Sequence, residues 1–142
     1  MKAIFARQRG LASWLIRLAC WSRWSHIAVV EDDQTLIHST FLGGGVRRVS
    51  LFDFLAEYSA TELMEVSVPD EAAALAFVRA QIGRPYDWTA LVGISLRRDW
   101  AEPDKWFCSE LFEACLLAGG LVRWRESVSR ITPQHQYMLA PT

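Results

Sequence analysis

Two β-rich segments joined by an acidic turn constrain the fold of this chain more than any other feature. The first is WSHIAVVED at residues 24–32, and the second is TLIHST at residues 35–40. Apolar and β-branched runs separated by a short polar turn predict a β-hairpin. Each strand carries one histidine, His26 or His38, and a tight turn would let the two side chains approach each other across the strand pair.

The remainder of the sequence predicts alternating helices and strands. Ser50 is a candidate N-cap for a helix at residues 51–59, and Pro69-Asp70 opens a helix at 71–83. Strands are also predicted at residues 2–7, after the three glycines at 43–45, and at 61–68. A mostly buried helix is predicted at residues 11–21, and another helix runs from 108 to Gly119-Gly120. The pattern predicts an α+β fold with helices on one face of an antiparallel sheet.

The segments between these elements have weaker signals. Residues 84–94 begin as a turn and then favour a helix, residues 97–105 read as a loop, and the tail at 131–142 is irregular. The 142 residues, of which 51% are hydrophobic, are enough for one core. We therefore expect a single domain, residues 1–142.

The apolar run at residues 11–21 is not expected to be a secretion signal. Arg17 interrupts it, no small-residue cleavage site follows, and it is too short to span a bilayer. The three cysteines, an odd number without close pairing, fit a reducing compartment. These features predict a cytoplasmic protein without a transmembrane segment; a phage-encoded protein released by lysis is the alternative.

Positive charge is concentrated at the start of the chain. Residues 1–30 contain five basic and no acidic residues, whereas the whole chain has a net charge of -1. The overall charge gives no general attraction to nucleic acid, so we expect no nucleic-acid partner. The basic segment favours peripheral contact with an anionic polymer or lipid surface, against the simpler alternative of scattered, solvated arginines.

Cys108 is the candidate nucleophile. It stands at the predicted start of the helix CSELFEACLLA, where unpaired backbone N–H groups and the helix dipole favour a thiolate and can stabilise an oxyanion. The alternative is a small buried apolar side chain, as most free cysteines are. Cys20 and Cys115 lie within apolar helical runs and are interpreted as core residues.

A cysteine nucleophile needs a base, and only three histidines are available. In the predicted hairpin, one of His26 and His38 can act as the base while the other fixes its tautomer and orientation. His135 follows Cys108 by 27 residues in TPQHQ, outside any predicted strand, and is interpreted as a non-catalytic surface residue. The tryptophans, including Trp14, Trp21 and Trp24, are expected to lie mostly in the core.

Four motifs in order resemble a known family. WSHIAVV, LIHST followed by GGGV, GRPYDW, and WFCSELF are similar to the circularly permuted branch of the NlpC-type papain-like hydrolases, which includes YiiX/YebB-like proteins and relatives of lecithin:retinol acyltransferase. In that branch the histidine hairpin precedes the cysteine helix. The resemblance covers residues 4–133 and implies a permuted papain-like fold with the nucleophile at a helix N-terminus.

The resemblance also implies roles for individual residues. Cys108 matches the nucleophile, His26 the base and His38 the third polar residue, while Tyr86 matches the tyrosine of the PYxW stretch and belongs in the pocket wall or near the oxyanion. One departure is that Trp106 and Phe107 replace the small or acidic residue that often precedes the cysteine. A more apolar entrance is expected, which weakens transfer of a cell-wall peptide substrate.

Three functions compete on the sequence alone. The first is a cysteine hydrolase or acyltransferase that forms a covalent acyl-enzyme on a small-molecule, peptide or lipid substrate without a cofactor. The second is a metal site built from Cys108 and the histidines, which lacks a metal-binding motif such as CxxC or HExxH. The third is an inactive lipid- or peptide-binding module of the same fold.

Overall fold

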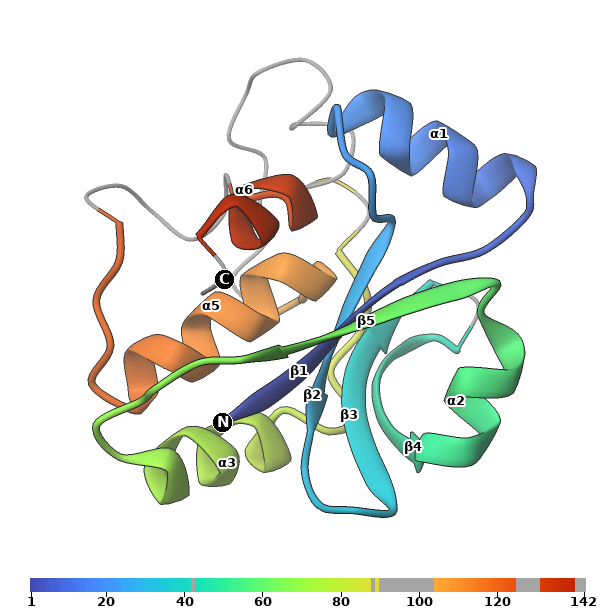
Figure 1. Ribbon diagram of the computed structural model, residues 1–142. Helices are drawn as coiled ribbons and strands as arrows, with labels where there is room; N and C mark the ends of the chain where they lie inside the picture. The colour runs from blue at the N-terminus through green and yellow to red at the C-terminus, as the bar shows by residue number, and fades with distance from the viewer. Residues whose placement is uncertain (42, 88, 90–103, 125–130, 140–142) are drawn as a thin grey trace.

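The computed structural model describes residues 1–41, 43–87, 89, 104–124 and 131–139. Five strands form one antiparallel sheet in the order β4-β3-β2-β1-β5 (Figure 1). Their bounds are β1 Lys2–Arg7, β2 His26–Val30, β3 Thr35–Thr40, β4 Gly45–Ser50 and β5 Ala60–Glu65. The predicted mixture of helices with an antiparallel sheet is confirmed.

The hairpin predicted from residues 24–40 is present. Strands β2 and β3 pair antiparallel, with Val29 opposite Ile37 and Val30 opposite Leu36. Backbone amides of Gln34 and Thr35 donate to the Asp32 carboxylate, at 2.8 and 2.7 Å, and this closes the turn. The acidic turn thus fixes the register that carries both histidines.

Five helices accompany the sheet in the described residues: α1 Leu11–Ala19, α2 Leu51–Glu57, α3 Glu71–Ala80, α5 Cys108–Ala118 and α6 Pro133–Met138. The predicted caps are confirmed, since Ser50 accepts from the Asp53 amide and Asp70 accepts from the Ala73 amide. Helix α5 begins at Cys108, as predicted, and ends at Gly119 as its C-cap. The predicted loop at 97–105 and helix in 84–94 lie largely outside the described residues, as do Trp88 and Trp100.

The helices lie on both faces of the sheet, so the expectation of one covered face is wrong (Figure 1). Ile27 of β2 belongs to the core cluster that includes Phe112 of α5. Ala28, the next residue, belongs to a second cluster with Phe54 of α2. Because successive strand residues point to opposite faces, β2 carries apolar side chains on both sides and packs against a helix on each.

Helix α1 is also different from the expectation, because it is not mostly buried. Its apolar side chains Leu11, Trp14, Leu15 and Leu18 are all at least 50% exposed, and Trp21 after the helix is 89% exposed. The helix is attached through its other side, where Ser13 donates to Ser25 at 2.8 Å and Cys20 enters the core. Periodicity identified a helix correctly but could not show which side packs.

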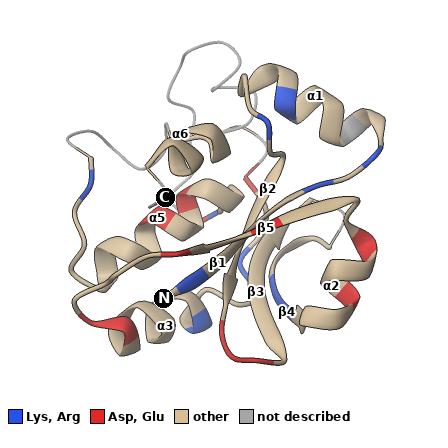
Figure 2. Cartoon of the chain, viewed as in Figure 1, with Lys and Arg blue, Asp and Glu red and all other residues tan. Residues whose placement is uncertain are grey.

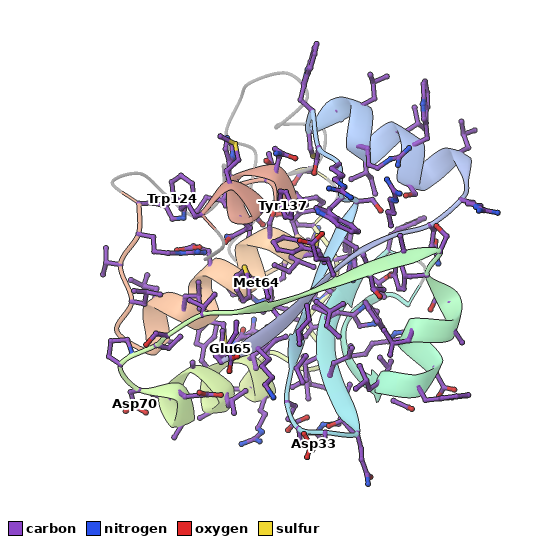
Figure 3. All side chains as sticks on the ribbon, viewed as in Figure 1. Asp33, Met64, Glu65, Asp70, Trp124 and Tyr137 are labelled. Atoms are coloured by element: carbon purple, nitrogen blue, oxygen red, sulfur yellow. The ribbon has the colours of Figure 1, made fainter. Side chains whose placement is uncertain are left out.

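The C-terminal segment forms helix α6, where an irregular tail was expected. Thr132 caps this helix and accepts from the His135 amide. Tyr137 projects from α6 toward the strands (Figure 3), and its ring packs edge-on to Phe5 at 5.4 Å and lies 6.0 Å from Trp24. Trp24 is therefore a core residue, as predicted. In the described ranges, no helix is long and apolar enough to cross a bilayer.

Candidate functional site

The two hairpin histidines contact each other directly. His26 is the first residue of β2, His38 lies on β3, and His26 Nε2 is 2.8 Å from His38 Nδ1. Both side chains are buried. The structure therefore brings together the two residues that the hairpin pattern predicted would approach each other.

Aromatic rings from α2 and the residue after it enclose the histidine pair. Tyr58 stacks on His26 with a centroid distance of 5.6 Å and an interplanar angle of 5°. The Phe54 ring lies 6.0 Å from His26 and 5.4 Å from His38. These contacts fix the orientations of both imidazoles and keep water away from them.

The enclosure controls the charge state of the pair. Burial lowers the pKa of His26 well below its usual range, and the charges of His38 and Arg47 lower it further. Burial, reinforced by the charge of Arg47, lowers the pKa of His38 to about 4. Both imidazoles are consequently neutral at pH 7, which is the state required of a proton acceptor.

Arg47 is the third member of the polar cluster, and no sequence motif pointed to it. It lies directly opposite His38 in the β3–β4 ladder, and its Nε donates to His38 Nε2 at 3.4 Å. A Cβ atom on Gly43 would come within 2.6 Å of Arg47 Nε, so glycine leaves the space that the guanidinium occupies. The predicted short strand after the glycines is the sequence signal that could have drawn attention to Arg47.

Two proton arrangements fit the contact between the histidines. In one, His38 Nδ1–H donates to His26 Nε2, and His38 Nε2 accepts from Arg47. In the other, His26 Nε2–H donates to His38 Nδ1, which leaves His26 Nδ1 without a proton. In the second arrangement His38 Nε2 carries a proton and cannot accept from Arg47. That contact is long for a hydrogen bond, at 3.4 Å, so its loss costs little free energy.

Replacing Arg47 with methionine is expected to favour the second arrangement. The variant removes the donor to His38 Nε2 and the positive charge that lowers the pKa of both histidines, so the pKa of His38 should rise. Long-range proton–nitrogen NMR spectra of the imidazoles report the tautomers and the titration directly. Arg48→Met is the matched control, because Arg48 pairs with Glu31 instead. Unchanged tautomers and an unchanged His38 pKa would contradict this role for Arg47.

Cys108 begins helix α5 and is 2% exposed. The carboxylate of Glu110 accepts from the Phe107 amide at 3.1 Å, which caps the helix just before the cysteine. Ser109 donates its hydroxyl to the Ile131 carbonyl and anchors the first turn. The expected position of the cysteine at a capped helix start is confirmed.

The ionisation of Cys108 differs from the expectation. Burial raises the pKa of the Cys108 thiol to about 12, although hydrogen bonding from the backbone of Ile27 and Ser109 acts in the opposite direction. The favourable effect of the helix start is therefore present but smaller than the cost of desolvating a thiolate. The resting side chain is a neutral thiol at pH 7.

Ile27 connects the cysteine to the histidine pair. The sulfur of Cys108 lies at the backbone of Ile27, the residue that follows His26. Ile27 packs in the core cluster that includes α5, and the His26 ring stacks on Tyr58. Burial, as the largest cause, and the nearby Cys108 both raise the pKa of Tyr58, so the ring stacked on His26 also lies near the thiol. Among the hydrogen bonds of the described residues, none joins Cys108 to His26 or His38. The structure thus brings the histidines into contact and places the thiol beside the start of the same strand.

Tyr86 lies close to the cysteine region. It is buried, its ring packs against Phe107 at 5.9 Å, and its backbone forms a bridge with Trp106. Burial, with Cys108 as the next contributor, raises the pKa of the Tyr86 phenol. Phe107 is completely buried and packs in the core, so it does not form the apolar entrance that the sequence suggested.

The remaining candidates have structural positions. His135 is exposed on α6, and its Nδ1 accepts from the Thr132 amide at 3.1 Å. Cys20 and Cys115 are buried, as predicted, and Cys115 Sγ donates to the Ala74 carbonyl at 3.1 Å. Within the described ranges, no group of three or more His, Cys, Asp or Glu side chains is placed to hold a metal ion.

Comparison with known proteins identifies a shared fold. No protein-family model matches the sequence, and no curated protein matches it. The chain is similar to the crystal structure of the metalloprotein yiiX from Escherichia coli O157:H7, with a TM-score of 0.65 and 22% sequence identity. The match covers 84% of this chain and 66% of that chain, so this chain spans slightly less than two thirds of its neighbour.

Proposed function

We propose that this chain is a cysteine-dependent hydrolase or acyltransferase in which Cys108 is the nucleophile, His26 the base and His38 the residue that orients it. The carrying observation is the 2.8 Å contact between His38 and His26, the first residue of β2. The backbone of the next residue, Ile27, hydrogen-bonds to the Cys108 sulfur. Nucleophile, base and orienting group are the three components of such a site. The permuted papain-like fold that the motifs resemble supports the same assignment.

The described residues do not fit a bound metal, although the structural neighbour is called a metalloprotein. His26 Nε2 and His38 Nδ1 face each other at hydrogen-bond distance, so these two nitrogens do not converge on a common ion. No third ligand completes a cluster within the described ranges. No step of the proposed reaction is assigned to a metal ion.

The charge states define how the thiol is activated. Both Cys108 and His26 are neutral at pH 7, because burial raises the pKa of the thiol and lowers the pKa of the imidazole. Proton transfer then accompanies attack: the S–H proton moves to His26 Nδ1 as the sulfur–carbon bond forms and the carbonyl oxygen becomes an oxyanion. His26 donates that proton to the leaving group, which departs and leaves an acyl-thioester on Cys108.

The second half of the reaction reverses the proton path. Water, or another acceptor with an N–H, O–H or S–H group, loses a proton to His26 Nδ1 and attacks the thioester carbonyl. The carbon–sulfur bond breaks, the thiolate takes back the proton, and the acyl product leaves. His38 Nδ1 accepts from His26 Nε2–H throughout, which is the tautomer that the Arg47 contact opposes.

The substrate contains an amide, ester or thioester carbonyl. Peptidoglycan peptides, lipid esters and acylated proteins all provide such bonds. Tyr86, which lies next to Phe107 and near the cysteine, is the proposed wall of the acyl pocket. We assign it no role in proton transfer.

A second candidate is an inactive lipid- or peptide-binding module. The observation that favours it is the burial of Cys108, which is 2% exposed and has a raised thiol pKa. A buried neutral cysteine is ordinary in a protein core. Inertness of Cys108 toward acylating reagents separates this function from the enzymatic one.

The pH dependence of ester hydrolysis tests the enzymatic proposal. Because the pKa of His26 is lowered well below its usual range, His26 stays neutral and the rate with p-nitrophenyl acetate should hold its plateau down through about pH 6.5, the ordinary histidine pKa. His26→Ala should lower that plateau by roughly 10²- to 10⁴-fold. An acidic limb centred at or above the ordinary pKa, or an unchanged rate in His26→Ala, would contradict the proposal.

A further inference from the structure

The most unusual surface feature of the molecule is the apolar stripe on α1. We define the stripe as Leu11, Trp14, Leu15, Leu18 and Trp21, all of them at least 50% exposed. The spacing of the first four, with steps of three, one and three residues, places them along one side of the helix. A contiguous apolar strip of this kind in water marks a surface that another apolar phase covers.

The end of the stripe is held in an uncommon backbone conformation. Trp21 has a φ angle of 47°, and it is the only non-glycine residue with positive φ among the described residues. Its side chain is 89% exposed, so the core gains nothing from the conformation. Such local strain is typical of functional surfaces and here presents an indole ring to the exterior.

A basic cavity lies beside the stripe. Its volume is about 310 Å³, and its lining includes Arg7, Arg9, Arg17, Trp14 and Ser59. The cavity is formed by the end of β1, the start of α1 and the segment before β5. Trp14 belongs to both the cavity and the stripe, which makes the two features continuous.

The cationic groups of this cavity are its three arginines. In the part of the chain that the structure describes, no salt bridge engages Arg7, Arg9 or Arg17. The Arg17 Nε atom is buried without a hydrogen-bond partner. The carboxylate next to the cavity is that of Glu57, and it accepts from Gln8, which lines the cavity, at 2.8 Å. The cavity therefore presents cationic donors to an anion that approaches from outside.

Basic and acidic residues are also separated along the molecule, with the basic ones near α1. Figure 2 shows basic residues but no acidic residue on α1 and the segments that flank it. The acidic β2–β3 turn, marked by Asp33 in Figure 3, lies at the opposite end of the hairpin. An apolar stripe with tryptophans, flanked by arginines on a helix that carries no acidic residue, has the chemistry of a helix that lies in an anionic lipid interface.

We propose that α1 docks this protein onto the surface of an anionic phospholipid bilayer. The stripe enters the boundary between headgroups and acyl chains, and the arginine cavity holds a lipid phosphate. Trp21 and Trp14 sit at headgroup depth, where amphipathic rings are favoured. Because Ser13 of α1 donates to Ser25, the residue before His26, docking of α1 brings the start of β2 close to the bilayer.

Vesicle sedimentation tests this docking independently of any enzymatic activity. The full chain is expected to bind vesicles of phosphatidylcholine mixed with about one third phosphatidylglycerol, and much less to phosphatidylcholine alone. Trp21→Asn should weaken binding by at least about tenfold, because it removes a large apolar contact. Asparagine also tolerates positive φ, so the variant is expected to fold.

The charge variants test the cavity. Arg9→Gln and Arg17→Gln should each weaken binding by about fivefold. Lys2→Gln removes the same charge at the other end of β1 (Figure 1) and should have a smaller effect. Phe52→Ser is the control for general hydrophobicity, because Phe52 is 79% exposed on α2. Cys108→Ala is expected to bind like the parent chain, so docking and chemistry are measured separately.

Three results would overturn the proposal. The first is no binding to anionic vesicles. The second is equal loss of binding in Trp21→Asn and Phe52→Ser, since the stripe would then have no special role. The third is a dimer in solution that Trp21→Asn dissociates without any vesicle binding, which would identify a second copy of the chain as the occupant of the stripe.

Discussion

Cys108→Ala is expected to abolish acyl-transfer activity, with a loss of at least about 10³-fold, while leaving the fold intact. The proposed reaction has no route without a covalent bond to this sulfur, so nothing compensates for its removal. Circular dichroism and the urea midpoint confirm folding of the variant. The rate is measured with an activated ester and with a thioester.

Cys115→Ala provides the matched control for that variant. Cys115 lies on the same helix, two turns along, and is also buried with a raised thiol pKa. Its Sγ donates to Ala74, so removing it should cost about 1–2 kcal/mol of stability. Its activity should remain near that of the parent. Equal activity losses in the two variants would show that the effect is structural and would remove Cys108 as nucleophile.

The second large effect is a loss of stability in mild acid. The folded-state pKa of His38 is lowered to about 4, and that of His26 is lowered well below its usual range. In the unfolded chain both histidines bind protons near pH 6.5. Their stabilising contribution is therefore complete above about pH 6.5 and is lost as the pH falls toward the folded-state pKa values.

The size of this effect follows from the pKa difference. Between about pH 6.5 and pH 5, His38 should lower the free energy of unfolding by about 1.5 kcal/mol, and His26 should lower it further in the same direction. This interval lies above the ordinary range of carboxylates, so it isolates the histidines. Urea denaturation at both pH values measures it. His38→Asn should reduce the difference, whereas the exposed His135→Gln should retain it, and equal stability at the two pH values would contradict a buried neutral pair.

The local features of the fold were predictable because each depends on neighbouring residues. The EDDQ turn sets the hairpin, and the hairpin brings His26 and His38 to 2.8 Å. Ser50 and Asp70 indicate helix starts because each side chain accepts a hydrogen bond from the backbone N–H three residues later. The start of α5 at Cys108 was likewise visible in the sequence.

Features that depend on contacts distant in sequence were not predictable. The stripe on α1 has the periodicity of a buried helix face, but no sequence pattern states which side meets the sheet. The placement of α2 on the second sheet face depends on the direction in which the chain turns after β4, which no local pattern specifies. The thiol pKa of Cys108 was expected to fall from the helix start alone, whereas the structure adds complete burial, which outweighs it.

Arg47 illustrates an intermediate case. The valines at 46 and 49 favour a strand that includes Arg47, but its contact with His38 requires the exact β3–β4 register. The three preceding glycines leave the length of the turn open from sequence. The lowering of the histidine pKa values by Arg47 therefore depends on the β3–β4 register.

The central claim is that Cys108 forms an acyl-enzyme with the help of His26. The most direct measurement uses protein in which Cys20 and Cys115 are alanine, treated with p-nitrophenyl acetate and analysed by intact-protein and peptide mass spectrometry. The account predicts an acetyl group on Cys108 that forms quickly, is lost by hydrolysis, and is nearly absent in the His26→Ala background. No adduct, or equal adduct formation with and without His26, would contradict the account and favour the binding module.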